Sequence, residues 1–456
     1  MADRKRILIV GGVAGGASCA ARARRLSESA DIVIFDRGPY VSFANCGLPY
    51  YVGNVIKKEE DLLVATPDLF RQRFNIDVRL RSNVKSIDCA NRRIQVNDLE
   101  RGTTYTEDYD ALVLSPGARP IRPELPGIDL PGIFSLRTIP DSREIVQWIE
   151  QYQARQAVVV GGGYIGMELG TVYATLGSQV VVVEAADNIL TGADPDLARP
   201  IAARATRRFK EIRTKVKVLD MATKGPQIKV TMDWNGERVE ELYDRVLVSV
   251  GRVPNADDLG LENTRVTRDD RGYIEVDEFQ QTQDPAILAI GDIAGGVLLA
   301  HKASREARIA VERILGESAT EEDFLIPAVV FTDPELTWCG VTEAEARAKG
   351  LTVEIAKFPW SASGRALTFD RPDGMTKLVI DPETERVLGV GIVGHGAGEL
   401  IAEGVVAMEM GATAMDLALS VHPHPTLSET LMECAEVFYG HATHALARKR
   451  RDGAGS

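Results

Sequence analysis

The sequence predicts an α/β fold in which two Rossmann-like dinucleotide-binding domains are followed by a C-terminal α+β domain. Two observations support this prediction. A strand, a glycine-rich turn, a helix and a second strand follow one another over residues 5–36, and the same order recurs over residues 157–184. From about residue 326 strands and helices alternate less regularly, which indicates a separate domain.

The first glycine-rich turn, Gly11–Gly16, lies between a strand at 7–10 and a helix expected to end near residue 26. Gly11 permits the tight turn, Gly16 permits close packing of helix and strand, and the helix N-terminus offers N–H groups to a pyrophosphate. Val13 replaces the middle glycine of the usual fingerprint. Asp36 ends the next strand, where an acid can bind ribose hydroxyls.

The second fingerprint is complete, with Gly161, Gly163 and Gly166 followed by Glu184 at the end of the next strand. Two alanines come directly after Glu184. A site for a 2′-phosphate usually has an arginine nearby, and a carboxylate repels that phosphate. The second domain is therefore predicted to bind NADH in preference to NADPH.

Short apolar strands that end near glycine lie between and after the two fingerprints, and the C-terminal part has its own set of elements. The first set is 111–114, 246–250 and 287–290. In the C-terminal part we expect strands near 328–331, 351–358, 376–381 and 387–394, and helices near 343–349, 397–410 and 426–437.

Composition and charge narrow the class of protein. The 456 residues leave room for about three domains of about 150 residues each. A net charge of −13 makes nucleic acid a poor partner, and no apolar run reaches the about 20 residues that cross a membrane. The short N-terminus Met1–Arg6 leads directly into a strand and does not read as a secretory signal. We therefore expect a cytoplasmic protein that binds neither nucleic acid nor membrane.

The five cysteines are spaced without close pairs. This pattern argues against a disulfide framework and against a zinc site, so we expect a reducing compartment and no metal. Cys19, Cys339 and Cys434 lie in expected helices or strands and are predicted to be small buried side chains. Cys46 differs from them, because it lies in the run Val41–Tyr50 shortly after the first fingerprint.

The whole chain resembles the flavoprotein disulfide reductases with two dinucleotide sites, the group of glutathione reductase and dihydrolipoyl dehydrogenase. Besides the two fingerprints, the matching runs are Leu114–Pro120, Val250–Asn255 and Ala289–Asp292. The resemblance implies FAD at the first fingerprint, with Asp292 at the ribityl chain, and NAD at the second. It also implies that Gly117 and Gly251 lie at the cofactor sites.

The resemblance further implies a domain organisation and a homodimer whose active site is shared between the subunits. The expected domains are a split FAD-binding domain (1–150 and 271–325), an NAD-binding domain (151–270) and a dimerisation domain (326–446). Residues 447–456 form a basic tail that we expect to be disordered.

Two branches of this group are combined in one chain. Residues from about 5 to 150 are similar to coenzyme A-disulfide reductases and the related NADH oxidases and peroxidases, through the single-cysteine motif Ser42–Tyr50. From about residue 157 the chain is more similar to dihydrolipoyl dehydrogenase; the runs that carry this likeness are Gly163–Glu168, Leu299–Lys302, Phe358–Ala366 and His424–Glu429. The second cysteine of that enzyme is missing, and so is the lysine that follows it. Glu168, the expected partner of that lysine, remains.

A lone thiol excludes an internal two-cysteine shuttle but can form a mixed disulfide or a sulfenic acid. We expect Cys46 at the start of a helix, whose dipole favours a thiolate. The resemblance implies that His424 protonates the departing thiolate and that Glu429 orients His424.

Four further residues are candidates for binding the substrate. Ser42 and Asn45 match coenzyme A contacts of the coenzyme A branch. Arg22 and Arg25, on the first helix, are placed where they could hold anionic phosphates.

The leading hypothesis is an NADH-dependent FAD enzyme that reduces a small-molecule disulfide or persulfide, with coenzyme A disulfide as the first candidate. One alternative is a dihydrolipoyl dehydrogenase-type enzyme acting on a lipoyl carrier. Others are an NADH oxidase or peroxidase that cycles through a sulfenic acid on Cys46, and a flavin-bound redox sensor.

Overall fold

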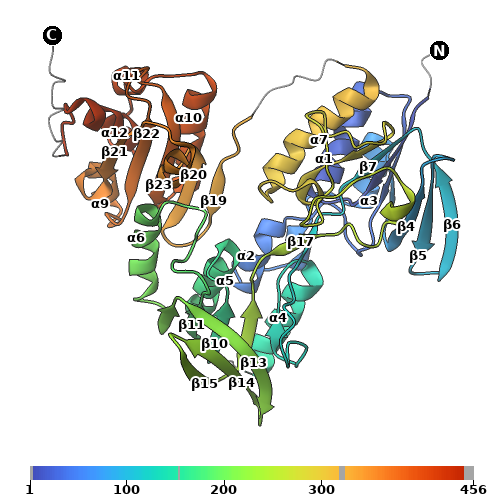
Figure 1. Ribbon diagram of the computed structural model, residues 1–456, viewed down its shortest axis with the longest axis horizontal. Coiled ribbons are helices and arrows are strands. Elements are labelled where there is room, and N and C mark those ends of the chain that lie inside the picture. The colour runs from blue at the N-terminus through green and yellow to red at the C-terminus, as the bar shows by residue number, and fades with distance from the viewer. Residues whose placement is uncertain (1–3, 153–154, 318–323, 446–456) are drawn as a thin grey trace. The chain divides into compact units, whose positions relative to one another are not determined.

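The computed structural model describes residues 4–152, 155–317 and 324–445 (Figure 1). The basic tail expected at 447–456 lies outside these residues. The chain divides into two compact units. Unit 1 is Met1–Ile121, Leu136–Val146 and Gly251–Asp323, and unit 2 is Arg122–Ser135, Gln147–Val250 and Phe324–Ser456. Within the described ranges, no helix combines the length and the apolar character needed to cross a membrane. The division into three domains stays a prediction.

A five-stranded parallel sheet forms the centre of unit 1, in the order β18-β7-β1-β2-β3. Its strands are β1 (Arg6–Val10), β2 (Asp31–Phe35), β3 (Asp77–Arg79), β7 (Ala111–Leu114) and β18 (Ile287–Ala289). β1 lies between β2 and β7, so the chain order reverses beside it. Ligands of such sheets bind at this reversal, outside the carboxyl ends of the strands, and the first fingerprint begins there.

The two faces of this sheet are covered differently. Helices α1 (Ala14–Leu26) and α7 (Ala300–Leu315) lie side by side on one face (Figure 1), where Ile7 and Ile9 of β1 join their apolar core. An antiparallel sheet of β4 (Ser82–Asp88), β5 (Arg93–Asp98) and β6 (Thr103–Asp108) packs against the other face through Val84 and Ile94. The remaining short elements of unit 1 are α2 (Leu48–Val52), α3 (Pro67–Phe74), β8 (Ala118–Pro120) and β17 (Arg252–Pro254), and α4 (Ile139–Tyr152) begins in this unit.

Unit 2 repeats this design around the second fingerprint. Its parallel sheet has the order β12-β11-β10-β16-β9, with α5 (Tyr164–Thr175) after the glycine turn. The strands are β9 (Ile133–Phe134), β10 (Gln156–Val160), β11 (Gln179–Val183), β12 (Glu211–Arg213) and β16 (Arg245–Val248). An antiparallel sheet of β13 (Val216–Lys224), β14 (Gln227–Trp234) and β15 (Glu237–Tyr243) packs on it. Both dinucleotide-binding folds expected from the sequence are thus confirmed.

The C-terminal part of unit 2 is an antiparallel sheet in the order β19-β20-β23-β22-β21, covered by helices. The strands are β19 (Ala328–Val330), β20 (Glu335–Gly340), β21 (Glu354–Pro359), β22 (Met375–Ile380) and β23 (Val387–Gly394). The helices are α8 (Glu343–Lys349), α9 (Gly364–Thr368), α10 (Ala397–Glu409), α11 (Ala414–Leu419) and α12 (Glu429–Tyr439), and α6 (Pro195–Ala205) packs against β23. The predicted α+β domain is confirmed.

The cysteines divide as the sequence predicts. Cys19, Cys339 and Cys434 are buried in apolar cores, Cys89 is half-buried, and Cys46 is exposed. No disulfide joins any of the five. Burial raises the pKa of Cys19 to about 12 and that of Cys434 to about 12, so these two thiols are unreactive.

Candidate active site

The two glycines that frame the first fingerprint are required by their close contacts. A Cβ on Gly11 would lie 2.1 Å from the carbonyl oxygen of Ser115, and the residue has a φ of 93°. A Cβ on Gly16 would lie 1.8 Å from the carbonyl oxygen of Gly11. Gly161 and Gly166 make the same close contacts in the second fingerprint. No side chain fits at these four positions. Because glycine has none, β1 and β10 can each be followed directly by a helix.

The middle position of the fingerprint is less restricted. A Cβ on Gly163 would meet no atom within 4 Å, because it would point into open space. Val13 occupies the equivalent position of the first fingerprint and lines a cavity there. The missing middle glycine therefore changes the wall of the first site without disturbing its backbone.

Each fingerprint is closed by an acid at the end of the second strand. The Asp36 carboxylate accepts hydrogen bonds from the N–H groups of Gly12 (2.8 Å) and Gly38 (2.7 Å). Burial raises the pKa of Asp36, and these two donors oppose that effect. Glu184 accepts likewise from Gly162 (2.6 Å) and Ala186 (2.8 Å). A carboxylate has about four acceptor sites, so each acid keeps some for ribose hydroxyls.

Unit 1 holds a cavity of about 790 Å³ beside the first fingerprint. Known ligand pockets measure about 300 to 1,000 Å³. Asp36, Asn45 and Arg137 are among the lining residues. Within the described residues Oδ1 of Asn45 is buried without a hydrogen-bond donor, so this acceptor is available to a ligand. The acid, the glycine turn and the free acceptor fit a dinucleotide such as FAD.

Two arginines that the sequence did not mark as site residues hold Asp292. Oδ2 of Asp292 pairs with Arg252 at 2.7 Å and with Arg137 at 3.5 Å. Arg252 lies in the run that carries the family resemblance, so it could have been proposed from the sequence. Nothing in the sequence around Arg137 distinguishes it from a surface arginine, since its contact with Asp292 depends on tertiary packing.

Cys46 lies in the 3-10 turn Asn45–Gly47, and α2 begins only at Leu48 and has five residues. The expected position at the start of a helix is thus approximate, and so short a helix has a weak dipole. The half-buried cation of Arg137 acts on the thiol as well. Burial lowers the pKa of Arg137, while the negative charges of Asp292 and Cys46 oppose that shift. The same attraction favours the thiolate form of Cys46.

His424 and Glu429 form a hydrogen-bonded pair in unit 2. Nδ1 of His424 lies 2.9 Å from Oε1 of Glu429, and the Thr426 N–H donates to Oε2 at 2.7 Å. Burial raises the pKa of Glu429, but Thr426 and His424 outweigh this effect and hold the pKa below its usual value. An ionised Glu429 fixes a proton on Nδ1, which leaves Nε2 to exchange a proton with a substrate. The His424 side chain is 72% exposed within a single chain.

His422, two residues earlier, has both ring nitrogens engaged. Nε2 lies 2.6 Å from Oε1 of Glu403, and Nδ1 lies 2.8 Å from the carbonyl oxygen of Ser420. Its side chain is mostly buried. These contacts support a structural role for His422, as its position outside the His-Pro-Thr motif suggests.

Glu168, on α5, has a backbone partner in place of the missing lysine. The Phe331 N–H donates to Oε1 of Glu168 at 2.9 Å. Burial raises the pKa of Glu168 to about 7, with the Phe331 N–H acting against the shift. Glu168 therefore has a carboxyl group that can be protonated near neutral pH.

The four candidate substrate residues are in different environments. Ser42 donates its backbone N–H to the Gly12 carbonyl at 2.8 Å, which places it against the first fingerprint near Asn45. Arg25 is exposed on α1. Arg22 pairs with Glu312 of α7 at 2.7 Å, so a phosphate at Arg22 would compete with that carboxylate.

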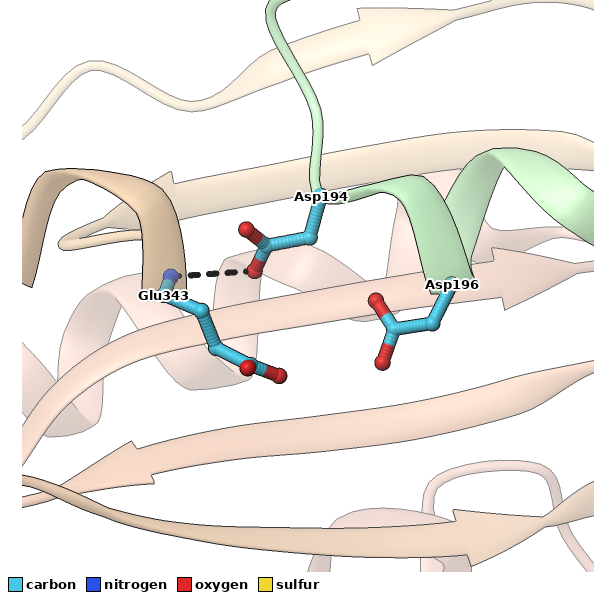
Figure 2. Close-up of side chains that lie close together, drawn as sticks. All are labelled: Asp194, Asp196 and Glu343. Carbon is cyan, nitrogen blue, oxygen red and sulfur yellow. Dashed lines mark hydrogen bonds between the residues drawn. The ribbon is translucent and has the colours of Figure 1, made fainter. Parts of the chain in front are cut away.

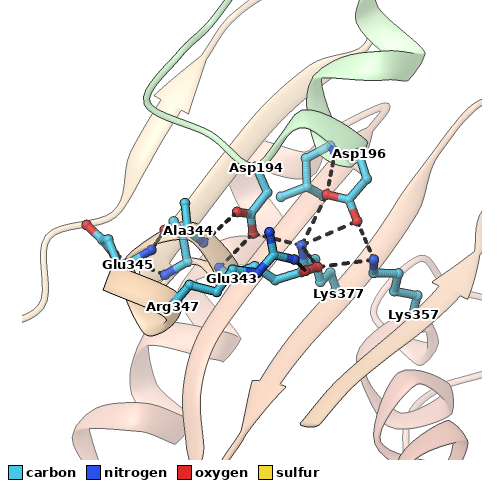
Figure 3. Close-up of polar contacts among 10 residues, drawn as sticks. Asp194, Asp196, Glu343, Ala344, Glu345, Arg347, Lys357 and Lys377 are labelled. Atoms are coloured by element: carbon cyan, nitrogen blue, oxygen red, sulfur yellow. Dashed lines mark hydrogen bonds and ion pairs between the residues drawn. The ribbon is translucent and has the colours of Figure 1, made fainter. Parts of the chain in front are cut away.

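The described part of the chain contains one group of acidic side chains with spacing suitable for a metal ion: Asp194, Asp196 and Glu343 (Figure 2). The Lys377 ammonium lies among them, at 2.7 Å from Asp194, 3.1 Å from Asp196 and 2.5 Å from Glu343 (Figure 3). Lys357 also pairs with Asp196, at 2.6 Å. The lysines occupy the position that a cation would take, so the cluster joins α6 to the C-terminal sheet as an ion-pair network.

Two fingerprint turns, each closed by an acid, and a cavity of dinucleotide size define a protein that handles two dinucleotides. Residues 5–307 match the family described as pyridine nucleotide-disulphide oxidoreductase, and residues 326–435 match its dimerisation domain. The chain belongs to this family of enzymes, whose members use FAD and NAD(P)H. The predicted enzyme class and cofactor classes are confirmed at this level.

The relatives show the mixed likeness that the sequence predicts. The chain is 41% identical to dihydrolipoyl dehydrogenase of Vibrio parahaemolyticus over 344 residues, which are 75% of this chain and 70% of that protein. The same enzyme of Halobacterium salinarum is 43% identical over 344 residues, 75% of this chain and 71% of that protein.

Solved structures extend this likeness to the other branch. The reduced CoADR-RHD of Bacillus anthracis has a TM-score of 0.85 and 29% identity, and the match covers 96% of this chain and 80% of that one. A NAD-dependent persulfide reductase of A. fulgidus has a TM-score of 0.84 and 26% identity, with 95% and 83% covered. The description as a combination of two branches is confirmed.

Replacing Lys377 with methionine tests the ion-pair network. Lys377 is 1% exposed and Asp194 is 4% exposed, so the variant leaves the buried Asp194 carboxylate without its lysine. Asp196 and Glu343 keep their pairs with Lys357. We expect a loss of about 3 to 5 kcal/mol in the free energy of unfolding, measured by urea denaturation. The control Lys357→Met removes a lysine that is 41% exposed and should change the free energy by about 0 to 1 kcal/mol.

The same network should weaken in acid. Burial raises the pKa values of Asp196 and Glu343, but Lys357 and Lys377 outweigh it and hold both values below normal. The contribution to stability is then complete above about pH 4.5 and is lost as the pH falls through the folded-state pKa values. A wild-type stability that does not fall between about pH 5 and 3 relative to Lys377→Met would contradict this assignment.

Replacing Arg137 with methionine tests its action on Cys46. The variant removes the half-buried cation and keeps most of the side-chain volume. We expect slower alkylation of Cys46 by iodoacetamide at pH 7, about tenfold for each unit by which the thiol pKa rises, measured by peptide mass spectrometry. Arg143→Met is the matched control, because Arg143 lies nearby in the sequence, on α4, and pairs with Glu59 at the surface. Equal rates in the two variants would show that Arg137 does not act on the thiol.

Proposed function

We propose that the protein is an NADH-dependent, FAD-containing reductase of a small-molecule disulfide or persulfide that uses Cys46 as its only redox-active protein sulfur. The observation that carries this proposal is the state of the five cysteines. Cys46 is exposed next to a residue that lines the unit 1 cavity, and the other four are buried or half-buried free thiols. Five cysteines without a disulfide also fit a reducing cytoplasm.

In this proposal the residues of unit 1 hold the flavin. Gly11, Gly16 and Asp36 receive the pyrophosphate and ribose, and Gly117 lies between the lining residues Pro116 and Ala118. Arg252 and Arg137 both bind Oδ2 of Asp292, so Oδ1 keeps its lone pairs for a ribityl hydroxyl. The chemistry that FAD would supply at this site is the transfer of two electrons from NADH to sulfur.

The nicotinamide nucleotide belongs to the second fingerprint, where Gly161, Gly163 and Gly166 admit the pyrophosphate. Glu184 faces the ribose there, and Gly251 follows the β16 strand. Arg213 lies beside Glu184, since the Glu184 N–H donates to the Arg213 carbonyl at 2.9 Å, and its side chain is already paired with Glu211 at 2.6 Å and with Glu241 at 2.9 Å. These contacts favour NADH, and the persulfide reductase of similar structure is described as NAD-dependent.

The chemistry follows from one thiol and one acid. The Cys46 thiolate attacks a sulfur of the substrate disulfide R–S–S–R, the S–S bond breaks, and Cys46–S–S–R forms. His424, as an imidazolium oriented by Glu429, gives its Nε2 proton to the departing RS⁻. Two electrons and a proton that come from NADH convert the mixed disulfide to a second RSH and the Cys46 thiolate. The sum is NADH + H⁺ + R–S–S–R → NAD⁺ + 2 RSH.

We propose further that the active site is shared in a homodimer. The chain carries the family's dimerisation domain at 326–435. Large apolar side chains are exposed on α10, α11 and the following turn, just ahead of His424. They are Val406, Met410, Met415, Leu419 and Val421. A second copy that covers this surface would bring its own His424 to the Cys46 of the first.

Coenzyme A disulfide is the first substrate to test. Ser42 and Asn45 lie together at the first fingerprint, and the structural likeness includes the CoADR-RHD of Bacillus anthracis. A lipoyl carrier is the second candidate, because the relatives at 41% identity are dihydrolipoyl dehydrogenases. The ion pair between Arg22 and Glu312 leaves Arg25 as the more accessible phosphate contact on α1.

Replacing Cys46 with serine tests the cycle. We expect the variant to retain its flavin absorbance and to lose NADH oxidation driven by coenzyme A disulfide, because the serine hydroxyl cannot form a mixed disulfide. Cys89→Ser, a half-buried free thiol of the same unit, should keep full activity.

Intact mass spectrometry of the isolated protein identifies the natural thiol from its adduct on Cys46. Disulfide reduction retained in Cys46→Ser would refute the cycle. Reduction of NAD⁺ by dihydrolipoamide would favour the lipoyl carrier, and a stable sulfenate formed by hydrogen peroxide would favour a peroxidase.

The nucleotide preference is tested by steady-state kinetics. We expect kcat/KM for NADH to exceed that for NADPH by about 100-fold or more, since the carboxylate of Glu184 repels the 2′-phosphate. Glu184→Ser should narrow this difference by improving the value for NADPH. A wild-type enzyme that prefers NADPH would overturn the role given to Glu184.

A further inference from the structure

Helix α12 has a row of acidic side chains that continues beyond the pair with His424. Glu429, Glu433 and Glu436 are spaced by four and three residues, so they lie on one face of the helix. Glu429 binds His424. Glu433, one turn further on, is 4% exposed, and a carboxylate so deeply buried requires a partner.

His444 provides that partner. Its Nδ1 lies 2.5 Å from Oε1 of Glu433, and its backbone N–H donates to Oε2 at 3.4 Å. The chain reaches this position because Gly440 ends α12 in a left-handed conformation, with a φ of 75°. The His441 N–H then donates to the Glu436 carbonyl at 3.0 Å, so the segment turns back toward the helix. The ring and the backbone of His444 thus hold the same carboxylate.

The two histidine–glutamate pairs share one electrostatic environment. The hydrogen bond to Glu433 and its charge raise the pKa of His444, burial opposes this, and Glu429 and Glu436 add to the rise. His444 is in turn one of the groups that hold the pKa of Glu429 low, after Thr426 and His424. The charged groups around His444 are therefore three carboxylates of α12, with His424 and His441 at the two ends of the row.

We propose that His444 is a positioning residue for the proton donor His424. Its positive charge neutralises Glu433, so that His424 responds mainly to Glu429 and not to a row of three carboxylates. Without that charge, His424 would hold its proton more tightly and release it more slowly to a thiolate. This inference rests on the proposed role of His424 as the acid of the reaction.

The test compares a neutral residue with a permanent cation at position 444. The His444→Gln holoenzyme should show a His424 titration midpoint that is higher than that of the wild type by several tenths of a pH unit. His444→Lys should not show this rise. The midpoint is read from ring-proton NMR of the 13C-histidine-labelled enzyme, with His424→Gln used to assign the signal. His441→Gln is the comparison variant, because His441 lies in the same segment but acts on Glu436, at the far end of the row, and should raise the midpoint less than His444→Gln does.

The alkaline limb of kcat/KM for disulfide reduction should move upward in His444→Gln by the same amount as the NMR midpoint. Equal midpoints in the wild type and in His444→Gln would overturn the inference. A shifted NMR midpoint with an unmoved pH profile would support the effect of His444 on His424. The same result would refute the proposed role of His424 as the acid of the reaction. His444→Asn provides a second neutral variant if the glutamine does not fold.

Discussion

The close approach of the glycine-rich helices to their strands is the constraint on which both nucleotide sites depend. A Cβ on Gly16 or on Gly166 would lie within 2.0 Å of the carbonyl oxygen of the glycine that begins the turn. Because no side chain fits there, each helix starts directly at the carboxyl end of the central strand. The backbone N–H of the second glycine then reaches the acid on the neighbouring strand. Asp36 and Glu184 are thus placed by backbone packing alone.

This constraint is local in sequence, which explains why the two nucleotide folds could be predicted. Glycine positions, apolar strands and a terminal acid all appear within about 30 residues. The His424–Glu429 pair was predictable for the same reason, since both residues lie in one short motif. The antiparallel strands β4–β6 and β13–β15 were not predicted, because their exposed faces mix polar and apolar side chains and give no clear signal.

Residues whose roles depend on distant partners could not be predicted from the sequence. Arg137 contacts Asp292, 155 residues away in the sequence, only through the packing of unit 1. The sequence shows Lys377 only as a lysine within a strand. Its partner Asp194 lies 183 residues earlier and contacts it only in the folded chain. His444 depends on a left-handed glycine that turns the chain back along α12. In each case a buried or half-buried charged side chain forms an ion pair with a residue that only the tertiary structure brings near.

The combination of a single cysteine with a histidine–glutamate pair is chemically consistent under the proposed cycle. A general acid acts on the sulfur that leaves, and that sulfur belongs to the substrate. The placement of His424 therefore does not depend on how many cysteines the protein contributes. What the lone cysteine changes is the origin of the second sulfur, which must arrive with each substrate and stay bound to Cys46 until reduction. A single-thiol N-terminal part and a dihydrolipoyl dehydrogenase-like C-terminal part can then serve the same reaction, provided that the substrate itself carries the disulfide.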